Sequence, residues 1–321
     1  MERNYTPPSD RWAGRSSDPS IGIQYWYQAV NVIDLPSNVE CSEHIGLVGY
    51  VCDEGVRRNQ GRIGAKEGAA KVIERLGKLP YHHDPGLVAD FGDIRCDDED
   101  LESCQLSFAK AIQRLIGKGI LPIAIGGGHD IAYGHVKAII SSVPKGNKIG
   151  IINFDAHFDL RHVEDKANSG TPFGQLLIEN ADALEYMVLG IQQTANTKEL
   201  YDKARLLNVR YIENYSCQDK HWEKVERALN NFISEVDCIY ITIDMDGFSS
   251  AYAPGVSAPS PLGFTPYFVL KCLNYIFKSR KVISCDIAEV NPDFDQDNMT
   301  SNLAARLVDF IVERYSLYHI E

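Results

Sequence analysis

The feature of this sequence that most constrains its fold is the alternation of two kinds of segment. Short apolar runs rich in β-branched residues occur at five places, residues 44–50, 121–125, 149–154, 237–243 and 281–287. Amphipathic stretches separate or follow these runs, at residues 101–117, 131–141, 222–236, 267–277 and 301–318. Apolar runs of this length are typical of strands buried on both faces, and intervening helices imply crossovers between parallel strands. The alternation therefore predicts an α/β fold with a mostly parallel sheet.

The sequence also suggests how the chain is divided. Residues 1–40 are rich in Pro, Ser and Asp without a sustained period, so we expect an N-terminal arm on the surface, with a short helix near residues 23–32. No Pro/Gly/Ser-rich linker, internal repeat or step in composition interrupts residues 41–321. A chain of 321 residues is long enough to bury a substantial core. We therefore expect one domain at residues 41–321.

Charge and cysteine content restrict the partner and the compartment. The chain has 44 Asp and Glu residues against 32 Lys and Arg residues, a formal net charge of −12. Non-specific nucleic-acid binding needs a basic surface, and a membrane span needs ~18 apolar residues, which no window approaches. The N-terminus lacks the apolar segment of a secretory signal, and the eight cysteines form no CxxC pair. We expect a cytoplasmic protein with reduced thiols that binds neither nucleic acid nor membranes.

Carboxylates and histidines gather where four of the predicted strands end. The motifs at these ends are GGGHD (126–130), DAHFD (155–159), DMD (244–246) and DIAEVNP (286–292). In open parallel sheets, ligands bind beyond the carboxyl ends of the strands. This edge of the sheet is therefore the candidate site.

The spacing of these residues favours a metal centre. In extended backbone, side chains at i and i+2 face the same side, about 6.6–6.8 Å apart. Carboxylates brought together raise one another's pKa, and divalent cations remove that penalty. Carboxylates with a few imidazoles suit hard to borderline metals such as Mn²⁺, and two metals roughly 3.5–4 Å apart would use six ligands. The six candidate ligands are His129, Asp155, His157, Asp159, Asp244 and Asp246.

Each motif alone also has a purely structural interpretation. A single Asp after a strand usually caps a helix or forms a turn, and a lone histidine is more often packed or exposed than ligating. The Gly126–Gly128 run lacks the GxGxxG pattern of a nucleotide site and alone indicates only a turn. Their coincidence at several strand ends favours the metal centre, with glycines that let the chain turn so that His129 faces it.

The motifs GGGHD, NFDAHFDLR, TIDMDGF and DIAEVNP resemble the ureohydrolase (arginase/agmatinase) superfamily, over about Val48 to Val312. Members hydrolyse amidine and guanidine C–N bonds with a binuclear manganese centre. The resemblance implies a single-domain, three-layer αβα fold with a mostly parallel sheet of about eight strands. It also implies two Mn²⁺ ions per chain and a homo-oligomer, a trimer or hexamer.

The resemblance implies a role for each matched residue. One metal would take His129, Asp155, Asp159 and Asp244, and the other would take Asp155, His157, Asp244 and Asp246. Asp155 and Asp244 would therefore bridge the two ions. Glu289 matches the family glutamate that faces the cationic head group of the substrate. As a hypothesis of mechanism, beyond the resemblance, Asp159 would orient the attacking hydroxide and relay its proton.

Within the superfamily, the chain looks most like the formimidoylglutamases, which cleave N-formimidoyl-L-glutamate to L-glutamate and formamide in histidine degradation. The supporting segments are DEGVRRNQGRIGA (53–65), GGGHD where arginases tend to have GGDHS, and DAHFDLR followed by SGTPF (169–173). Ser169 stands where arginases and agmatinases usually have a histidine, which shuttles protons in arginases, so this departure disfavours an arginase and leaves the proton donor open.

The charge of that substrate predicts two kinds of partner. Its amidinium needs a carboxylate, which Glu289 supplies, and its carboxylates need cationic donors, ideally a guanidinium. Arg161, two residues past Asp159, is the preferred candidate. Further candidates, for which surface salt bridging is an equal alternative, are Arg57, Arg58 and Arg62.

Two other functions stay open at this point. One is a guanidine hydrolase that acts on agmatine or guanidinobutyrate and releases urea, against which Ser169 and the DEGVRRN segment speak. The other is a non-catalytic metal-binding homologue, which the complete ligand set and Glu289 disfavour.

Overall fold

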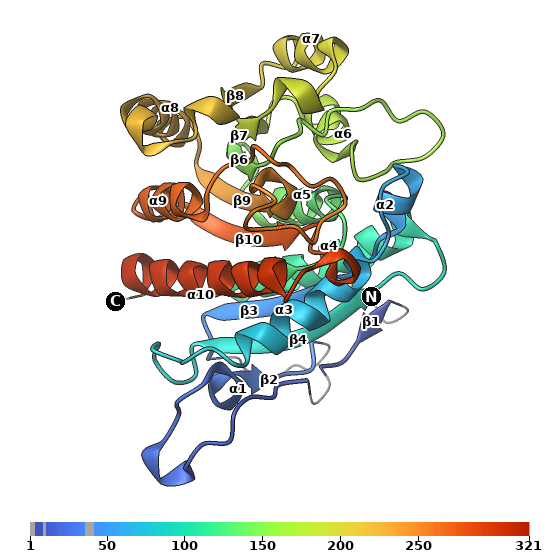
Figure 1. Cartoon of the computed structure of the whole chain (residues 1–321). Helices are drawn as coiled ribbons and strands as arrows, with labels where there is room; N and C mark the ends of the chain where they lie inside the picture. Colours follow the sequence, from blue (N-terminus) through green and yellow to red (C-terminus); the bar gives the residue numbers. More distant parts are fainter. Residues whose placement is uncertain (1–3, 9–10, 36–41, 321) are drawn as a thin grey trace.

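A computed structural model describes residues 4–8, 11–35 and 42–320 of the chain. Eight strands of four to eight residues form a parallel sheet (Figure 1). They are β3 (Ile45–Val51), β4 (Val88–Arg95), β5 (Leu121–Ile125), β6 (Ile149–Phe154), β7 (Leu184–Ile191), β8 (Arg210–Glu213), β9 (Cys238–Asp244) and β10 (Val282–Ala288). Two short strands, β1 (Tyr5–Thr6) and β2 (Asn31–Val32), pair with β4, which brings the sheet of the described residues to ten strands. The α/β fold with a mostly parallel sheet is confirmed, with two more strands than expected.

Helices cover both faces of the sheet. The large apolar cluster on one face takes side chains from α3 (Gly68–Leu76), α8 (Trp222–Ser234), α9 (Pro266–Phe277) and α10 (Met299–His319). The clusters on the other face take side chains from α4 (Leu101–Gly117), α5 (Ile131–Ser142), α6 (Pro172–Glu179) and α7 (Lys198–Leu206). Figure 1 shows α8, α9 and α10 in front of the sheet and α4 and α5 behind it. The three-layer αβα arrangement is therefore confirmed.

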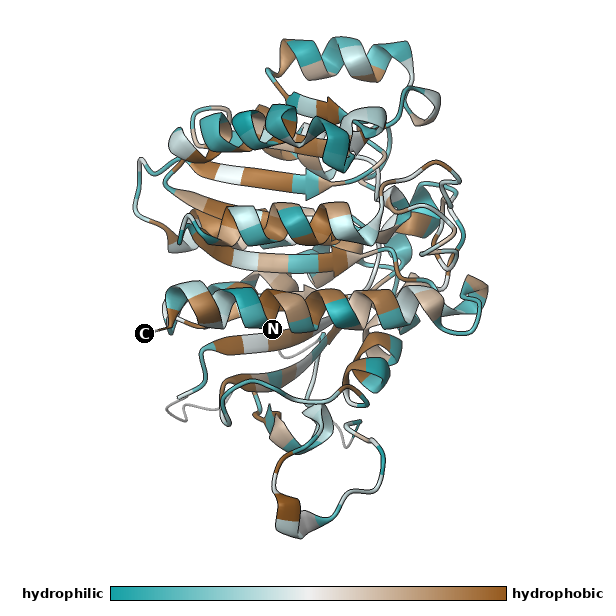
Figure 2. Cartoon of the chain, turned by 60° about the vertical axis from the view of Figure 1, so that its left-hand side comes forward, coloured by the Kyte–Doolittle hydropathy of each residue, from teal (hydrophilic) through white to brown (hydrophobic). Residues whose placement is uncertain are grey.

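The hydrophobic pattern explains this layering. All residues of β3, β5, β6 and β9 are buried, as expected for strands that helices cover on both faces. Figure 2 shows strands of mainly apolar residues between helices whose outer faces are hydrophilic. On α8 the buried side chains are Val225, Leu229 and Phe232, which lie on one face of the helix. No described helix is long and apolar enough to span a membrane.

The N-terminal segment is partly built into the domain. β1 pairs antiparallel with β4, and β2 pairs parallel with the same strand. The short helix expected near residues 23–32 is α1 (Trp26–Ala29). Its Trp26 is fully buried in the large apolar cluster, and the indole Nε1 donates a hydrogen bond to Asp309 Oδ1 on α10 at 2.9 Å. The expected boundary between residues 40 and 41 lies outside the described residues.

The order of the strands positions the candidate site. The sheet runs β1-β4-β3-β5-β10-β9-β6-β7-β8. The four strands whose ends carry the motifs, β5, β10, β9 and β6, are thus consecutive and central. Because these strands are parallel, their carboxyl ends meet at one edge of the sheet.

Candidate metal centre

A glycine turn after β5 presents the first histidine of the site. Gly126 and Gly127 have φ angles of +94° and +74°, which side chains other than glycine rarely adopt. A Cβ atom on Gly126 would also lie 2.6 Å from the backbone nitrogen of Ala69. The turn is held by a hydrogen bond from the Gly128 N–H to the carbonyl oxygen of Cys52 at 3.1 Å. The predicted role of these glycines as a sharp turn before His129 is therefore confirmed.

Three carboxylates surround the imidazole of His129. Its Nδ1 atom lies 3.1 Å from Asp155 Oδ2, 3.0 Å from Asp159 Oδ2 and 3.1 Å from Asp244 Oδ2. The four residues come from the ends of β5, β6 and β9, and each offers one ligand atom within 4.8 Å of the others. Three carboxylate oxygens around one imidazole nitrogen form a cage that a metal cation fits.

A second group of possible ligands adjoins the first. His157 Nδ1 lies 3.4 Å from Asp155 Oδ1 and 3.3 Å from Asp246 Oδ2. The ligand atoms of these three residues also lie within 4.8 Å of one another. Asp155 belongs to both groups, through its two oxygens. All six residues expected as ligands therefore converge, and the geometry offers two neighbouring positions for a cation.

Hydrogen bonds and backbone geometry fix the carboxylates. Asp155 Oδ1 accepts from the His157 N–H at 2.7 Å, and Asp155 Oδ2 accepts from Asn153 Nδ2 at 3.0 Å. Asp159 and Glu289 have φ angles of +50° and +65°. Left-handed backbone at residues other than glycine costs free energy and is found at functional sites, where the surrounding fold holds it.

Unsatisfied buried atoms show that the residues fit a cation. His129 Nδ1, Asp246 Oδ1 and Glu289 Oε2 are buried and have no hydrogen-bond partner among the described residues. His129 Nδ1 is close to three carboxylates, but none of them lies in hydrogen-bond geometry with it. Native proteins pair almost all buried polar atoms, so three such atoms in one cluster fit a cation as their partner.

The pKa values of the cluster also indicate that these residues fit a cation. Burial and the charges of Asp246 and Asp155 raise the pKa of Asp244 well above its ordinary value. Burial raises the pKa of Asp246 to about 6. Burial would lower the pKa of His129, but its carboxylate neighbours raise it well above the ordinary value. The carboxylates repel one another in a buried place, and bound cations would remove that cost.

A hydrogen-bonded relay behind the cluster orients His129. The second ring nitrogen, Nε2, lies 2.9 Å from Thr242 Oγ1, and this hydroxyl donates to Asp286 Oδ1 at 2.6 Å. The other oxygen of Asp286 accepts hydrogen bonds from Tyr240 and from His135 Nδ1. Because Thr242 donates to Asp286, it can accept a hydrogen bond from His129 Nε2, which leaves the Nδ1 lone pair facing the carboxylates.

A cavity of about 310 Å³ opens in front of these residues. Glu289 lines it, with Oε1 accepting from the His129 N–H at 2.9 Å and Oε2 unpaired. Ser169 also lines it, and its hydroxyl accepts from Asn59 Nδ2 at 3.0 Å. The exposed Arg161 lies on the same wall, and its guanidinium has no hydrogen-bond or ion-pair partner in residues 4–8, 11–35 and 42–320. The cavity thus combines a carboxylate floor with one unpaired cation.

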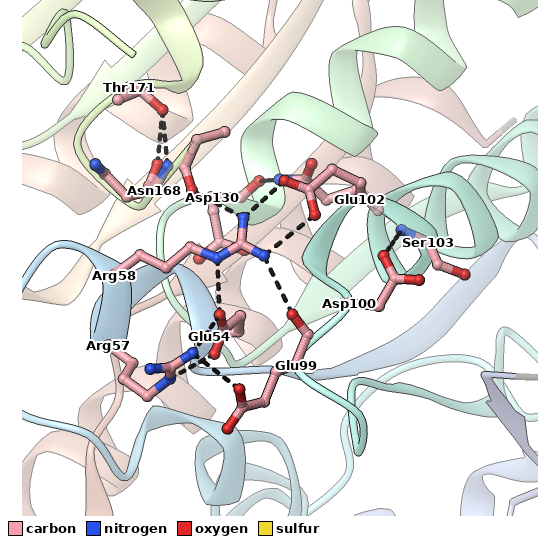
Figure 3. Close-up of polar contacts among 12 residues, drawn as sticks. Glu54, Arg57, Arg58, Glu99, Asp100, Glu102, Ser103, Asp130, Asn168 and Thr171 are labelled. Carbon is pink, nitrogen blue, oxygen red and sulfur yellow. Dashed lines mark hydrogen bonds and ion pairs between the residues drawn. The ribbon is translucent and has the colours of Figure 1, made fainter. Parts of the chain in front are cut away.

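The structure places the other candidate arginines in different surroundings. Figure 3 shows the guanidinium groups of Arg57 and Arg58 directed at glutamates. Both pair with Glu54 at 2.7 Å, and Arg58 also pairs with Glu102 at 2.7 Å. Arg62 Nε donates to the carbonyl oxygen of Ser257 at 2.9 Å. The salt-bridge alternative holds for Arg57 and Arg58, so Arg161 is the arginine that is left for a ligand.

Sequence reasoning missed several residues of the site. Asn59, Gln60 and Asn196 line the cavity. Asn196 Oδ1 accepts from the Phe158 N–H at 3.0 Å, and its Nδ2 donates to the Ala156 carbonyl oxygen at 2.9 Å, which fixes the loop after β6. The DEGVRRNQ segment contained a signal for Asn59 and Gln60. Asn196 has none, because its partners are about forty residues away in the sequence.

Comparison with known proteins places these motifs in a family. The family model described as "Arginase family" matches residues 43–312. A formimidoylglutamase of Psychrobacter cryohalolentis is 39% identical over an alignment of 336 residues. The alignment covers 96% of this chain and 97% of that protein. A formimidoylglutamase of Geobacillus thermodenitrificans is 41% identical over 305 residues, with 94% of each chain covered.

Solved structures agree with the fold. The crystal structure of formimidoylglutamase from Bacillus subtilis superposes with a TM-score of 0.79 at 26% identity, over 87% of this chain and 89% of that one. The crystal structure of Trypanosoma cruzi formiminoglutamase with Mn²⁺ gives a TM-score of 0.76 at 23% identity, over 88% and 96% of the two chains. The match along most of the sequence shows that the chain belongs to the arginase family.

Proposed function

We propose that this protein hydrolyses the C–N bond of N-formimidoyl-L-glutamate, with water as co-substrate and L-glutamate and formamide as products. The observation that carries the proposal is the presence of both charges in one cavity, which buried carboxylates and the unpaired Arg161 line together. An acidic amidine has the complementary charges, a cationic amidinium at one end and carboxylates at the other. The full-length likeness to formimidoylglutamases supports the same substrate.

Two Mn²⁺ ions per chain fit the donor set. His129, Asp155, Asp159 and Asp244 would hold one ion, and Asp155, His157 and Asp246 would hold the other. Asp244, which the family resemblance assigns to both ions, is grouped here only with the first. Carboxylates with one imidazole each form the kind of site that Mn²⁺ occupies. Two bound ions would lower the pKa of a shared water, which makes hydroxide available near neutral pH.

The side chains around the cavity would orient the substrate. Glu289 Oε2, buried and unpaired, accepts hydrogen bonds from the amidinium and so turns its carbon toward the ligand cluster. Arg161 binds a carboxylate of the glutamate part through charge-assisted hydrogen bonds. Ser169, on the wall of the same cavity, offers its hydroxyl to the polar part of the substrate. Holding both ends of the substrate in place contributes to the rate by fixing its orientation.

Asp159 is the residue that would move the proton. Its carboxylate lies at the mouth of the cluster, 12% exposed, with Oδ2 3.0 Å from His129 Nδ1. In this proposal it accepts a hydrogen bond from the attacking oxygen and passes the proton to the glutamate nitrogen as the C–N bond breaks.

The test is formamide release from N-formimidoyl-L-glutamate by the Mn²⁺-loaded protein, with a chelated sample as control. We expect formamide and glutamate in equal amounts, only in the loaded sample. Agmatine and guanidinobutyrate are assayed in parallel for urea. Urea without formamide would contradict the proposed substrate and favour a guanidine hydrolase. No product from any of them, with two Mn²⁺ bound per chain, would contradict catalysis itself.

Two expectations of the sequence analysis remain predictions, an assembly that the family resemblance implies and a location that the N-terminus and the cysteines imply. One is a homo-oligomer, a trimer or hexamer, which sedimentation velocity on the Mn²⁺-loaded protein tests. The other is a cytoplasmic location, which fractionation of the source cells tests.

A further inference from the structure

Three cysteines from distant parts of the sequence converge behind the glycine turn. Cys52 follows the end of β3, Cys96 follows the end of the neighbouring β4, and Cys104 lies in the first turn of α4. Their Sγ atoms all lie within 4.8 Å of one another. The Cys96 N–H donates to the carbonyl oxygen of Val51 at 3.0 Å, so the two strand ends hold Cys52 and Cys96 side by side.

The three thiols differ in their access to solvent. Cys52 and Cys104 are fully buried, whereas Cys96 is only partly buried. Every other cysteine in the described part of the chain is buried, and none belongs to a comparable group of thiols. A reagent from solvent can therefore reach the group through Cys96.

Hydrogen bonding within the group distinguishes the thiols further. Hydrogen bonds from the thiols of Cys104 and Cys52 lower the pKa of Cys96, although the nearby carboxylates of Asp98 and Glu54 oppose this. Hydrogen bonding to its two neighbours raises the pKa of Cys52. The lowered pKa favours the thiolate at the partly buried sulfur, and the thiolate is the reactive form of cysteine.

We propose that Cys52, Cys96 and Cys104 form an oxidisable thiol site, separate from the metal centre, in which Cys96 reacts with a hydroperoxide and a buried thiol then closes a disulfide. The Cys96 thiolate attacks one peroxide oxygen and the O–O bond breaks, which gives a sulfenic acid and, after protonation, an alcohol or water. The thiol of Cys52 or Cys104 then attacks the Cys96 sulfur, and the S–O bond breaks with loss of water. In sum, two thiols and one hydroperoxide give one disulfide, one alcohol or water, and one water.

The donor set favours oxidation over a thiolate-bound metal. Structural zinc sites take four protein ligands, and in the described chain no carboxylate or imidazole joins the three sulfurs within the same 4.8 Å. The buried carboxylate nearby, Asp130, accepts a hydrogen bond from the Tyr50 hydroxyl at 2.7 Å. A group of three thiols within 4.8 Å of one another, with one partly exposed member, is instead what a reacting and a resolving cysteine require.

The test begins with the unsubstituted, Mn²⁺-loaded protein, so its first result does not depend on whether a variant folds. The reduced protein is treated with a limiting amount of hydrogen peroxide and then mapped by non-reducing peptide mass spectrometry. We expect a Cys96 peptide joined to the Cys52 or the Cys104 peptide, with loss of two hydrogen atoms. Under the same treatment we expect Cys96 to react about tenfold faster than Cys238, because an ordinary thiol is only a few per cent thiolate at pH 7.

Variants and metal analysis complete the experiment. The Cys96→Ser protein should form no disulfide, whereas the matched control Cys238→Ser should form it as the parent does. A dimedone adduct at Cys96 in the Cys52→Ser, Cys104→Ser double variant would support the sulfenic acid step. Oxidation spread evenly over the cysteines would overturn the proposal. So would a thiophilic metal such as Zn²⁺ that the purified protein retains and the Cys96→Ser variant loses.

Discussion

Two groups of buried histidine and aspartate side chains lie next to each other in this sheet, and they differ in one respect. In the first group, His135 Nδ1 contacts Asp286 Oδ2 at 2.6 Å, its Nε2 contacts Ser284, and both oxygens of Asp286 accept hydrogen bonds. In the second group, His129 and Asp246 each keep a buried atom without a hydrogen-bond partner in the described chain. The same residue types thus form a complete network in one place and an incomplete one in the other. The incomplete one is where a ligand belongs.

One side chain connects the two groups. Thr242 on β9 contacts His129 through the same hydroxyl that donates to Asp286. The complete network is therefore in a position to fix the ring of a residue in the incomplete one. Partners of this kind orient metal-binding histidines and raise their basicity. If the comparison holds, changes in the incomplete group should affect metal binding directly, and changes in the complete group should affect it only through Thr242.

The largest effect is expected from Asp244→Asn. The substitution removes one negative charge from the cluster around His129 Nδ1, where Asp244 Oδ2 lies at 3.1 Å. We expect Mn²⁺ binding and formamide release to fall together below detection, as measured by metal analysis and by activity on the same sample. Asp237→Asn at the opposite end of β9, where the side chain accepts from the Lys148 N–H, is the matched control. An active, fully metal-loaded Asp244→Asn protein would contradict the site.

The second largest effect is expected from removal of the metal. A ligand that binds only the folded state at one hundred times its Kd stabilises that state by about 2.7 kcal/mol. We expect a chelator to lower the free energy of unfolding of the Mn²⁺-loaded protein by about this amount, measured by urea denaturation. The Asp244→Asn protein is the control, since it should show no change on chelation. Equal losses in both proteins would mean that the chelator acts elsewhere.

The fold was predictable where strand and helix patterns are local. The expected segment 101–117 is α4, and 121–125 is β5, because apolar periodicity alone determines both. β4 was not predicted. It carries Asp90, which is fully buried and pairs with Arg11 and with the indole of Trp12 in the N-terminal segment. A buried carboxylate obscures the apolar pattern of a strand, and its cationic partner lies 79 residues away.

The metal ligands were also predictable, because local strand patterns locate them in the sequence. Each candidate ligand lies at or just after the carboxyl end of a strand, so the fold class alone brings them together. The residues that support them were not predictable. Asn153 and Thr242 lie within apolar strands, and their roles depend on Asp155 and on His129, which only the folded sheet places beside them. Amide and hydroxyl groups carry no pattern that distinguishes such a role from an ordinary buried hydrogen bond.

A third prediction compares two arginines near the cavity. Arg161 has no partner among the described side chains, whereas Arg57 pairs with Glu54 at 2.7 Å. A hydrogen bond to a charged group contributes about 1.5–3 kcal/mol, which corresponds to a ten- to hundredfold change in kcat/KM. We expect Arg161→Met to lower kcat/KM by this factor, mainly through KM, in steady-state assays of formamide release. Arg57→Met should leave KM unchanged, and a similar rise in KM for both would contradict a specific role of Arg161.

The smallest effect tests the connection between the two groups. Thr242→Val keeps the shape of the side chain but removes the hydroxyl between His129 and Asp286. Loss of such a partner lowers metal affinity by about tenfold or more, and we expect the lower end because the ligands themselves remain. Isothermal titration calorimetry of the metal-free protein with Mn²⁺ measures this affinity. Ser284→Ala is the control, because Ser284 contacts His135 without contacting Thr242. If both substitutions weaken Mn²⁺ binding equally, the network acts through packing and not through the hydroxyl of Thr242.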